Sequence, residues 1–361
     1  MIAFGHEPQP VSPEMWPVTS LWRLMLCKLQ FALDRDPAAS SRFRRGNTFT
    51  ALGSAAHRLE ELVHKGRFDD VDESAVPNSI VECWEKLIQS ELNHLHAEWP
   101  EYEPVKPRDL PKYAYVFCNA TDRAANLALR RRARGAGGPR IVIEETLVDD
   151  DLRIEGRPDR YVVSGDSFSV TDIKSGAATS EIQPAHRHQL LTYCHLIAKT
   201  KGLVPKSILI QDVEGNCNEE PVTSDVVANH ISKVVEIRDE YTRISAEKEG
   251  FTRNAQPNTD ACRYCNYRVI CAAYWTLQDD ERQRDDFVGT VEVVPKYAAF
   301  TVRREKVRVG EPEYVTVLGY KPAVSIGSRV AIAGGYLHHN VMRAGIGTTV
   351  FIIEQPNARS S

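Results

Sequence analysis

Two acidic motifs in the middle of the chain have the residue types that metal-assisted phosphodiester hydrolysis requires. Asp159 ends the segment Gly156–Asp159, and Asp172 lies two residues before Lys174. Side chains alternate along a strand, so Asp172 and Lys174 are expected on the same face. With Asp159 delivered from a neighbouring strand, two carboxylates could hold Mg²⁺ or Mn²⁺, and Lys174 could orient and help deprotonate a water that attacks phosphorus. An isolated Asp-x-Lys triplet is weak evidence, because such triplets are common on solvated strands.

Three residues elsewhere could complete this site. His57 follows the small residues Gly53–Ala56 at the start of a predicted helix, and its neutral imidazole could be a third metal ligand. Gln189 and Tyr193 are four residues apart, so they share a helix face and could contact a nucleic-acid backbone or support Lys174. Taken singly, such residues are more often structural, as a half-buried histidine or the polar side of a helix.

Four cysteines form a second set with metal-ligand chemistry. Cys262, Cys265 and Cys271 follow the spacing Cys-x2-Cys-x5-Cys, and Cys27 lies far upstream. Four thiolates can bind a zinc ion or an iron–sulfur cluster, and the bond would join the two ends of a long region. Zinc modules usually draw their ligands from one short stretch, which this set does not. The spacing therefore favours a cluster over zinc, and both over free thiols.

The order of these motifs resembles a known nuclease family. His57 comes first, followed by Gly156-x-x-Asp159, Asp172-x-Lys174 and Gln189-x3-Tyr193. This order is similar to the RecB-type branch of the PD-(D/E)XK nuclease superfamily. The flanking cysteines resemble those of its iron–sulfur members, the AddB nuclease domain and the CRISPR-associated RecB-like exonucleases.

The resemblance covers about residues 20–274. Near its start, Cys27 to Phe31 is similar to the Cys-Pro-x-x-Phe opening of the family, with Lys28 in place of the proline. The resemblance implies metal ligation by His57, Asp159, Asp172 and the main-chain carbonyl of Ile173. It also implies that Lys174 is the catalytic lysine and that Gln189 and Tyr193 form the fourth motif. A mainly structural [4Fe-4S] cluster that supports DNA binding would be held by Cys27, Cys262, Cys265 and Cys271.

The function implied is that of a divalent-metal-dependent deoxyribonuclease, an exonuclease on single-stranded or frayed DNA ends. The alternative is a catalytically silent iron–sulfur subunit that binds nucleic acid in a repair or antiviral defence complex. The complete ligand set argues against this alternative, because a decayed site would be expected to lack a carboxylate or the lysine. The sequence has no Gly-x4-Gly-Lys-Ser/Thr loop, so any unwinding would need a helicase on another chain.

The hydrophobic pattern predicts a mixed α/β protein. Helices are expected at residues 21–33, 54–64, 80–95 and 185–199, and from Ser224 onward. Hairpins are expected over 141–155, around a turn at 149–151, and over 160–173, around Gly165, with a further strand at 207–211. The resemblance implies that these elements form a restriction-endonuclease-like core, in which helices flank a mixed central sheet.

The C-terminal part differs in character from the rest. We expect a nuclease domain over residues 1–278, a charged linker over 279–286 and a separate unit over 287–355. Five short alternating strands with glycine turns predict a small OB-like β-barrel there. Its open face could bind single strands, although such barrels equally serve protein contacts or packing. The candidate binding residues are Tyr297, Phe300, Arg303, Arg304, Lys306 and Tyr336. Residues 356–361 are expected to fray.

Composition narrows the possible partners and compartment. The 361 residues are 42% hydrophobic, without a stretch long and apolar enough for a membrane span and without the order of a signal peptide, which favours the cytoplasm. A net charge of −4 gives no general attraction to DNA, so binding would rest on local arginine runs within 42–45 and 130–140. Each run alone could equally be a solvated face or a loose loop.

Overall fold

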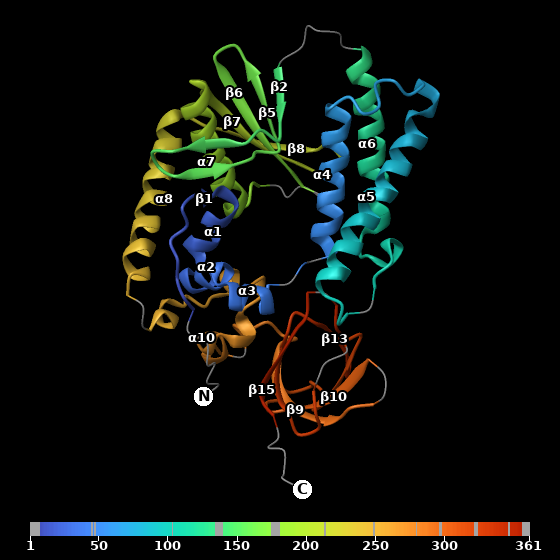
Figure 1. Ribbon diagram of the computed structural model, residues 1–361, viewed down its shortest axis with the longest axis vertical. Helices are drawn as coiled ribbons and strands as arrows, with labels where there is room; N and C mark the ends of the chain where they lie inside the picture. Colours follow the sequence, from blue (N-terminus) through green and yellow to red (C-terminus); the bar gives the residue numbers. More distant parts are fainter. Residues whose placement is uncertain are drawn as a thin grey trace.

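The computed structural model describes most of the chain between residues 8 and 355 (Figure 1). The described residues are 8–44, 46, 48–102, 104–133, 140–174, 181–212, 214–247, 250–278, 280–295, 298–320, 324–345 and 347–355. Outside this part lie Arg45 and Arg134 of the two arginine runs, the candidate binding residue Tyr297 and the tail 356–361.

A five-stranded mixed sheet forms the centre of the larger part of the molecule. In spatial order its strands are β2 (Arg140–Ile143), β5 (Arg160–Ser164), β6 (Ser167–Lys174), β7 (Val204–Asp212) and β8 (Cys217–Pro221). Only β6 and β7 run parallel, and helix α7 (Pro184–Lys201) makes the crossover between them and packs on both. The predicted hairpin around Gly165 is confirmed as β5–β6, with Gly165 at φ +62°. The expected mixed α/β class is also confirmed.

A small second sheet brings the N-terminal segment to the centre. Strand β4 (Ile154–Gly156) pairs with β3 (Leu147–Asp149) and, in parallel, with β1 (Trp16–Pro17). The predicted hairpin over residues 141–155 is therefore only partly correct, because residues 140–143 pair with β5 instead. The backbone leaves β2 at Glu144, whose φ of +52° turns the chain away from the first sheet.

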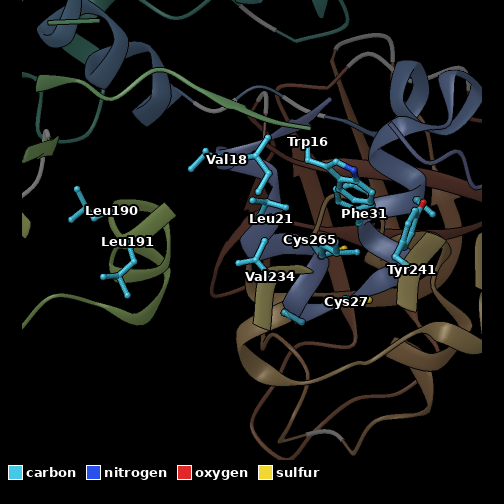
Figure 2. Packing of buried hydrophobic residues seen from close by; sticks show 14 of the residues in the cluster. Trp16, Val18, Leu21, Cys27, Phe31, Leu190, Leu191, Val234, Tyr241 and Cys265 are labelled. Atoms are coloured by element: carbon cyan, nitrogen blue, oxygen red, sulfur yellow. The ribbon is translucent and has the colours of Figure 1, made fainter. Parts of the chain in front are cut away.

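The main hydrophobic core lies under the N-terminal helices. Helix α1 (Val18–Leu26) and helix α2 (Lys28–Arg35) replace the single predicted helix, because Cys27 is extended between them and caps α2. Figure 2 shows Trp16, Phe31 and Tyr241 gathered near the buried cysteines, with Trp16 stacked on Phe31 at 5.6 Å. Tyr241 comes from helix α8 (Ser224–Ser245), which the cap near Ser224 predicts.

Three long helices form a second lobe beside the central sheet (Figure 1). They are α4 (Thr48–His64), α5 (Val76–Glu98) and α6 (Tyr113–Ala133), and they pack on one another around their own core. Helix α6 was not predicted. Its last turn holds part of the second arginine run, and Arg132 donates to the carbonyls of Phe68, Asp69 and Val71. That arginine therefore holds the lobe together. No helix within the described ranges is long and apolar enough to span a bilayer.

Short elements connect these parts. The three-residue helices 73–75 and 107–109 precede α5 and α6, and α3 (Pro37–Phe43) follows α2. The cysteine-bearing segment consists of a 3-10 helix at Phe251–Asn254, α9 (Thr259–Arg263), a 3-10 helix at Arg268–Ile270 and α10 (Ala272–Thr276).

A seven-stranded sheet forms the C-terminal part. In spatial order its strands are β13 (Tyr336–His338), β14 (Val341–Arg343), β11 (Tyr314–Leu318), β10 (Ala299–Arg304), β9 (Phe287–Val293), β12 (Arg329–Ala333) and β15 (Thr349–Glu354). The prediction of five strands is wrong, because the short hairpin of β13 and β14 turns at His339, which has φ +55°. Within the described residues the edge strands β13 and β15 do not pair, so the expected closed barrel is not found.

The C-terminal sheet is fastened to both other parts. Asp286, inside the expected linker, is buried and receives hydrogen bonds from Arg268, Tyr274 and the backbone of Gly334. On the other side, the Tyr102 hydroxyl at the end of the helical lobe donates to the carbonyl of Thr348, and the ring of Tyr102 packs on Tyr320 at 5.3 Å. The sheet thus bridges the cysteine segment and the helical lobe.

We expect Asp286→Ala to lower the free energy of unfolding by about 3–5 kcal/mol, because it leaves the buried Arg268 guanidinium without its carboxylate. Urea denaturation measures this loss. Glu292→Ala breaks the exposed pair with Arg303 on the same sheet and is the matched control, with an expected cost of less than about 1 kcal/mol. Equal costs for the two variants would contradict a structural role for Asp286.

Candidate active site

A cleft of about 1160 Å³ lies between the central sheet, the N-terminal end of α1 and helices α4 and α5. In Figure 1 this is the centre of the molecule, between α4 on one side and α1 and β1 on the other. All but one of the residues predicted for the nuclease site line this cleft, the exception being Asp172. They are His57, Asp159, Ile173, Lys174, Gln189 and Tyr193. Segments more than a hundred residues apart in the chain therefore contribute to one surface.

His57 on α4 faces the ends of the sheet strands. Its Nε2 is 2.8 Å from the main-chain oxygen of Ile173, and its Nδ1 is 3.5 Å from Asp159 Oδ1. The other carboxylate oxygen of Asp159 accepts a hydrogen bond of 2.8 Å from the backbone N–H of Ile173. The imidazole is thus held between two oxygen atoms that could both bind a cation.

Asp172 and Lys174 form an ion pair at the end of β6. Lys174 Nζ is 2.7 Å from Asp172 Oδ2, and both residues point to the same side of the strand, as alternation predicts. The Asp172 carboxylate is buried, and within the described part of the chain the Lys174 ammonium is the partner of Oδ2. A buried carboxylate oxygen with only an ammonium partner retains the capacity to coordinate a metal ion.

The environment of Asp159 disfavours its charge. The pKa of Asp159 is raised to about 6, chiefly by burial and also by Asp172, while His57, the backbone N–H of Ile173 and Lys174 act in the opposite direction. Two desolvated carboxylates close to each other resist ionisation together. A divalent cation would remove this penalty, because it would neutralise both.

The separations between these atoms suit a small octahedral cation. Neighbouring ligands at about 2.1 Å from Mg²⁺ lie about 3.0 Å apart, close to the 2.8 Å between His57 Nε2 and Ile173 O. Within the described residues, the set of side chains whose ligand atoms all lie within 4.8 Å of one another is His57, Glu144 and Asp159. Asp172 is not in this set, because its carboxylate turns toward Lys174.

Glu144 is the site residue that sequence reasoning missed. It follows β2 directly, and its left-handed backbone, at φ +52°, directs it into the cleft. A residue other than glycine in this conformation is strained by about 1–3 kcal/mol. Glu144 Oε2 pairs with Arg157 Nε at 2.6 Å. The sequence held no signal for it beyond an acidic residue at the end of a strand.

Gln189 and Tyr193 form the wall of the cleft on α7. Gln189 Nε2 lies 3.3 Å from the Tyr193 hydroxyl, so the expected shared helix face is observed. The pKa of Tyr193 is raised to about 12, chiefly by burial and also by Asp159, Asp172 and Glu144, while the hydrogen bond with Gln189 lowers it, so the phenol stays protonated and can donate. The approach is close: a Cβ on Gly156 would lie 2.7 Å from the Tyr193 ring and 2.7 Å from Val18, so only glycine fits there.

A buried charge network fastens α4 to the sheet. Glu60, one turn after His57, binds Arg123 of α6 at 2.9 Å and Arg160 of β5 at 3.5 Å. Arg160 also donates to Gln211 of β7 at 2.7 Å. Burial alone would raise the pKa of Glu60, but His64 and the two arginines hold it below the ordinary value. The network sets the distance between His57 and the strand end that carries Asp159.

The four predicted cysteines come together away from this cleft. Cys27, Cys262, Cys265 and Cys271 line one small pocket, and none of them is in a disulfide. Cys27 Sγ accepts backbone N–H groups from Gln30 and Gln256, each at 3.5 Å. Figure 2 shows Cys27 and Cys265 within the main core. The long-range contact implied by the spacing is therefore present.

The surroundings of these thiols also constrain their ligand. Burial, together with the neighbouring Cys27, raises the pKa of Cys262 and Cys265 and brings that of Cys271 to about 11. Thiols this close favour the thiolate state only when a bound metal offsets their charge. No three of the four sulfurs, all of which the structure describes, lie within 4.8 Å of one another. Sulfurs around a single zinc ion would be about 3.8 Å apart.

Some predicted nucleic-acid contacts on the C-terminal sheet are wrong. Phe300 is completely buried in the core of the sheet, and Arg304 is buried against Glu311. Arg303 is exposed and pairs with Glu292, while Tyr336 is 68% exposed. In the first arginine run, the Arg42 guanidinium lies 5.1 Å from the centre of the Phe351 ring, which ties it to the C-terminal sheet.

Comparison with known proteins identifies the family. Residues 16–272 match the model of the PD-(D/E)XK nuclease superfamily. A solved structure of a candidate exonuclease from Eubacterium rectale has 12% identity and a TM-score of 0.37, over 65% of this chain and 82% of that one. The structure of SSO0001 has 16% identity and a TM-score of 0.24, over 46% and 81%. No curated protein matches the sequence.

The two structural likenesses are too low to add to the assignment, which therefore depends on the family match over residues 16–272. That match spans every predicted motif from Cys27 to Cys271. The chain belongs to the PD-(D/E)XK nuclease superfamily.

Proposed function

We propose that this chain is a divalent-metal-dependent deoxyribonuclease of the RecB-type, iron–sulfur branch, and an exonuclease on single-stranded or frayed DNA ends. The observation that carries the proposal is the convergence of His57, Asp159 and Lys174 with the Ile173 carbonyl on one large cleft. We further propose a nuclease unit over residues 1–278, a C-terminal unit over 287–355, and a cytoplasmic location, where thiols stay reduced.

The proposed ligands of Mg²⁺ or Mn²⁺ are Asp159, Asp172, the Ile173 carbonyl and His57, and Glu144 joins them as a further carboxylate. When bound, the ion supplies Lewis acidity and neutralises charge at the phosphate. Asp172 holds the Lys174 ammonium at 2.7 Å, so that its positive charge can orient the attacking water and favour its deprotonation. Gln189 and the protonated Tyr193 would donate hydrogen bonds to the phosphate backbone of the DNA strand.

The second element of the proposal is a [4Fe-4S] cluster on the four cysteines. The donors fit, because four thiols line one buried pocket and backbone N–H groups reach Cys27 Sγ, as at cluster ligands. Lys28 occupies the first position of α2. Proline is favoured at this position of a helix, so the family's proline would fit the same backbone.

We expect Asp172→Asn and Lys174→Ala to reduce cleavage of single-stranded DNA by at least about a hundredfold, because each removes a charge that acts in the transition state. The assay is metal-dependent digestion of end-labelled linear DNA, with circular DNA to distinguish exonuclease from endonuclease action. Lys199→Ala, which breaks an exposed pair with Asp151, is the matched lysine control and should retain full activity. A wild-type protein that binds DNA and produces no shorter fragments would instead indicate a silent binding subunit.

Metal binding should strengthen as the pH rises through about 6. The pKa of Asp159 is about 6 in the folded protein, above its ordinary value of 3.8. The free energy of unfolding of the metal-free protein therefore falls as the pH rises from 3.8 to about 6, and a bound cation restores the lost stability. We expect Mn²⁺ to raise the melting temperature more at about pH 7.5 than at about pH 5. Asp159→Asn should abolish the rise in melting temperature with Mn²⁺ at both pH values. An equal rise for the wild type at both pH values would argue against Asp159 as a ligand.

The cluster can be tested by colour. Protein purified without oxygen should be brown, with broad visible absorption and stoichiometric iron, and Cys262→Ser should lose the colour and unfold at a lower temperature. Cys118→Ser, which changes an exposed thiol outside the set, is the control and should change neither property. Colourless protein with one zinc per chain would overturn the assignment.

A further inference from the structure

A second pocket, of about 380 Å³, lies where α10 meets the C-terminal sheet. We call it the junction pocket. Its principal lining residues are Trp275, Arg282, Arg304, Lys306, Arg308 and Arg329. They come from α10, the segment after it, the end of β10 with its following loop, and the start of β12. The junction pocket shares no lining residue with the catalytic cleft.

Positive charge predominates around the junction pocket. Five basic residues line it, against the two acids Asp286 and Glu305. Both acids are already engaged, Asp286 by Arg268 and Glu305 by Arg329, at 2.5 Å in each case. With the outside partners Arg268, Glu311 and Glu354 included, six basic groups face four acidic ones. A pocket with this excess attracts anions.

The basic groups are close enough to repel one another. Burial lowers the pKa of Arg282, and Arg308 and Arg304 lower it further, whereas Tyr274 and Asp286 oppose the effect. Arg304 is 5% exposed, and its Nε and Nη1 find no hydrogen-bond acceptor in the described residues. Its Nη2 pairs with Glu311 at 2.7 Å, so Arg304 offers the pocket N–H donors that lack an acceptor and not an uncompensated charge. An anion in the pocket would relieve this repulsion.

The shape and chemistry of the walls suit a phosphate attached to a nucleotide. The Arg282 guanidinium lies 5.6 Å from the centre of the Trp275 ring, and Trp275 Nε1 donates to the Val269 carbonyl at 3.2 Å, which fixes the ring. Guanidinium groups bind phosphate oxygens in a two-pronged geometry, and a fixed aromatic ring can pack on a base. Lys306 is exposed at the rim, where a strand would pass.

We propose that the junction pocket binds a backbone phosphate of a nucleic-acid strand through Arg282, Lys306 and Arg308, as a contact separate from the catalytic cleft. The proposal depends on the proposed function for the identity of the strand, but not on cleavage. A free nucleotide or inorganic phosphate has the same chemistry and is the competing source of the ligand.

The test compares two double variants of the full-length protein that each remove two positive charges. Lys306→Ala/Arg308→Ala changes the junction pocket, and Arg303→Ala/Arg343→Ala changes the same sheet outside it. Binding of a fluorescein-labelled oligothymidylate is measured by anisotropy in EDTA, so that cleavage does not contribute. Lys306→Ala alone, on an exposed side chain, provides a folded variant if the double change destabilises the protein.

We expect the pocket variant to bind the oligothymidylate about tenfold more weakly at about 0.1 M salt, with a salt slope smaller by about 0.7 per lost contact. The control should lose less than about twofold. Equal losses would reduce the effect to general electrostatics and overturn the proposal, as would no loss in either variant.

Melting temperatures with thymidine monophosphate or inorganic phosphate form the second arm. These compounds could raise the melting temperature of the wild type and of the control but not of the pocket variant. If the pocket variant also kept its affinity for oligothymidylate, the pocket would bind a free phosphate compound, and the proposal of a nucleic-acid strand would be overturned. Failure of DNA cleavage with retained pocket-dependent binding would reject the nuclease proposal alone.

Discussion

The burial of two carboxylates beside a lysine and a histidine is the constraint around which this molecule is built. Asp159 and Asp172 lie at the ends of adjacent strands, and their desolvation raises the pKa of Asp159 to about 6. Such an arrangement is costly without a cation, and only a rigid surround can keep it assembled. The Glu60 network and the close contact of Gly156 with Tyr193 provide that rigidity from opposite sides of the cleft.

The cleft is formed by parts that are stabilised elsewhere. The helical lobe contributes His57 and has its own core, while the sheet and α7 contribute the remaining residues. The C-terminal sheet joins the two at a distance, through Tyr102 on one side and Asp286 on the other. The sheet therefore links the two parts that form the walls of the cleft.

The cysteine segment is joined to the C-terminal sheet through Asp286. Arg268 lies between Cys265 and Cys271, donates to the Cys265 carbonyl at 2.8 Å and pairs with Asp286. Any ligand that orders the cysteine segment thus orders the attachment of the C-terminal sheet as well. The junction pocket lies on the same attachment, beside α10.

The motif order was enough to predict the superfamily and most of the residues that reach the cleft, and the hydrophobic pattern was enough to predict the mixed α/β class and the β5–β6 hairpin. Short periodic patterns and ligand spacings are local properties of a chain. Helix α6, the hairpin of β13 and β14 and the open seven-stranded sheet were not predictable in this way. Helix α6 has a weak pattern and ends in arginines that read as a loop, and three-residue strands carry too little periodicity. The position of Glu144 in the cleft, the contact of His57 with the Ile173 carbonyl and the junction pocket depend on which distant segments pack together. That packing is decided by the burial of side chains from the whole chain, so only the tertiary structure contains it.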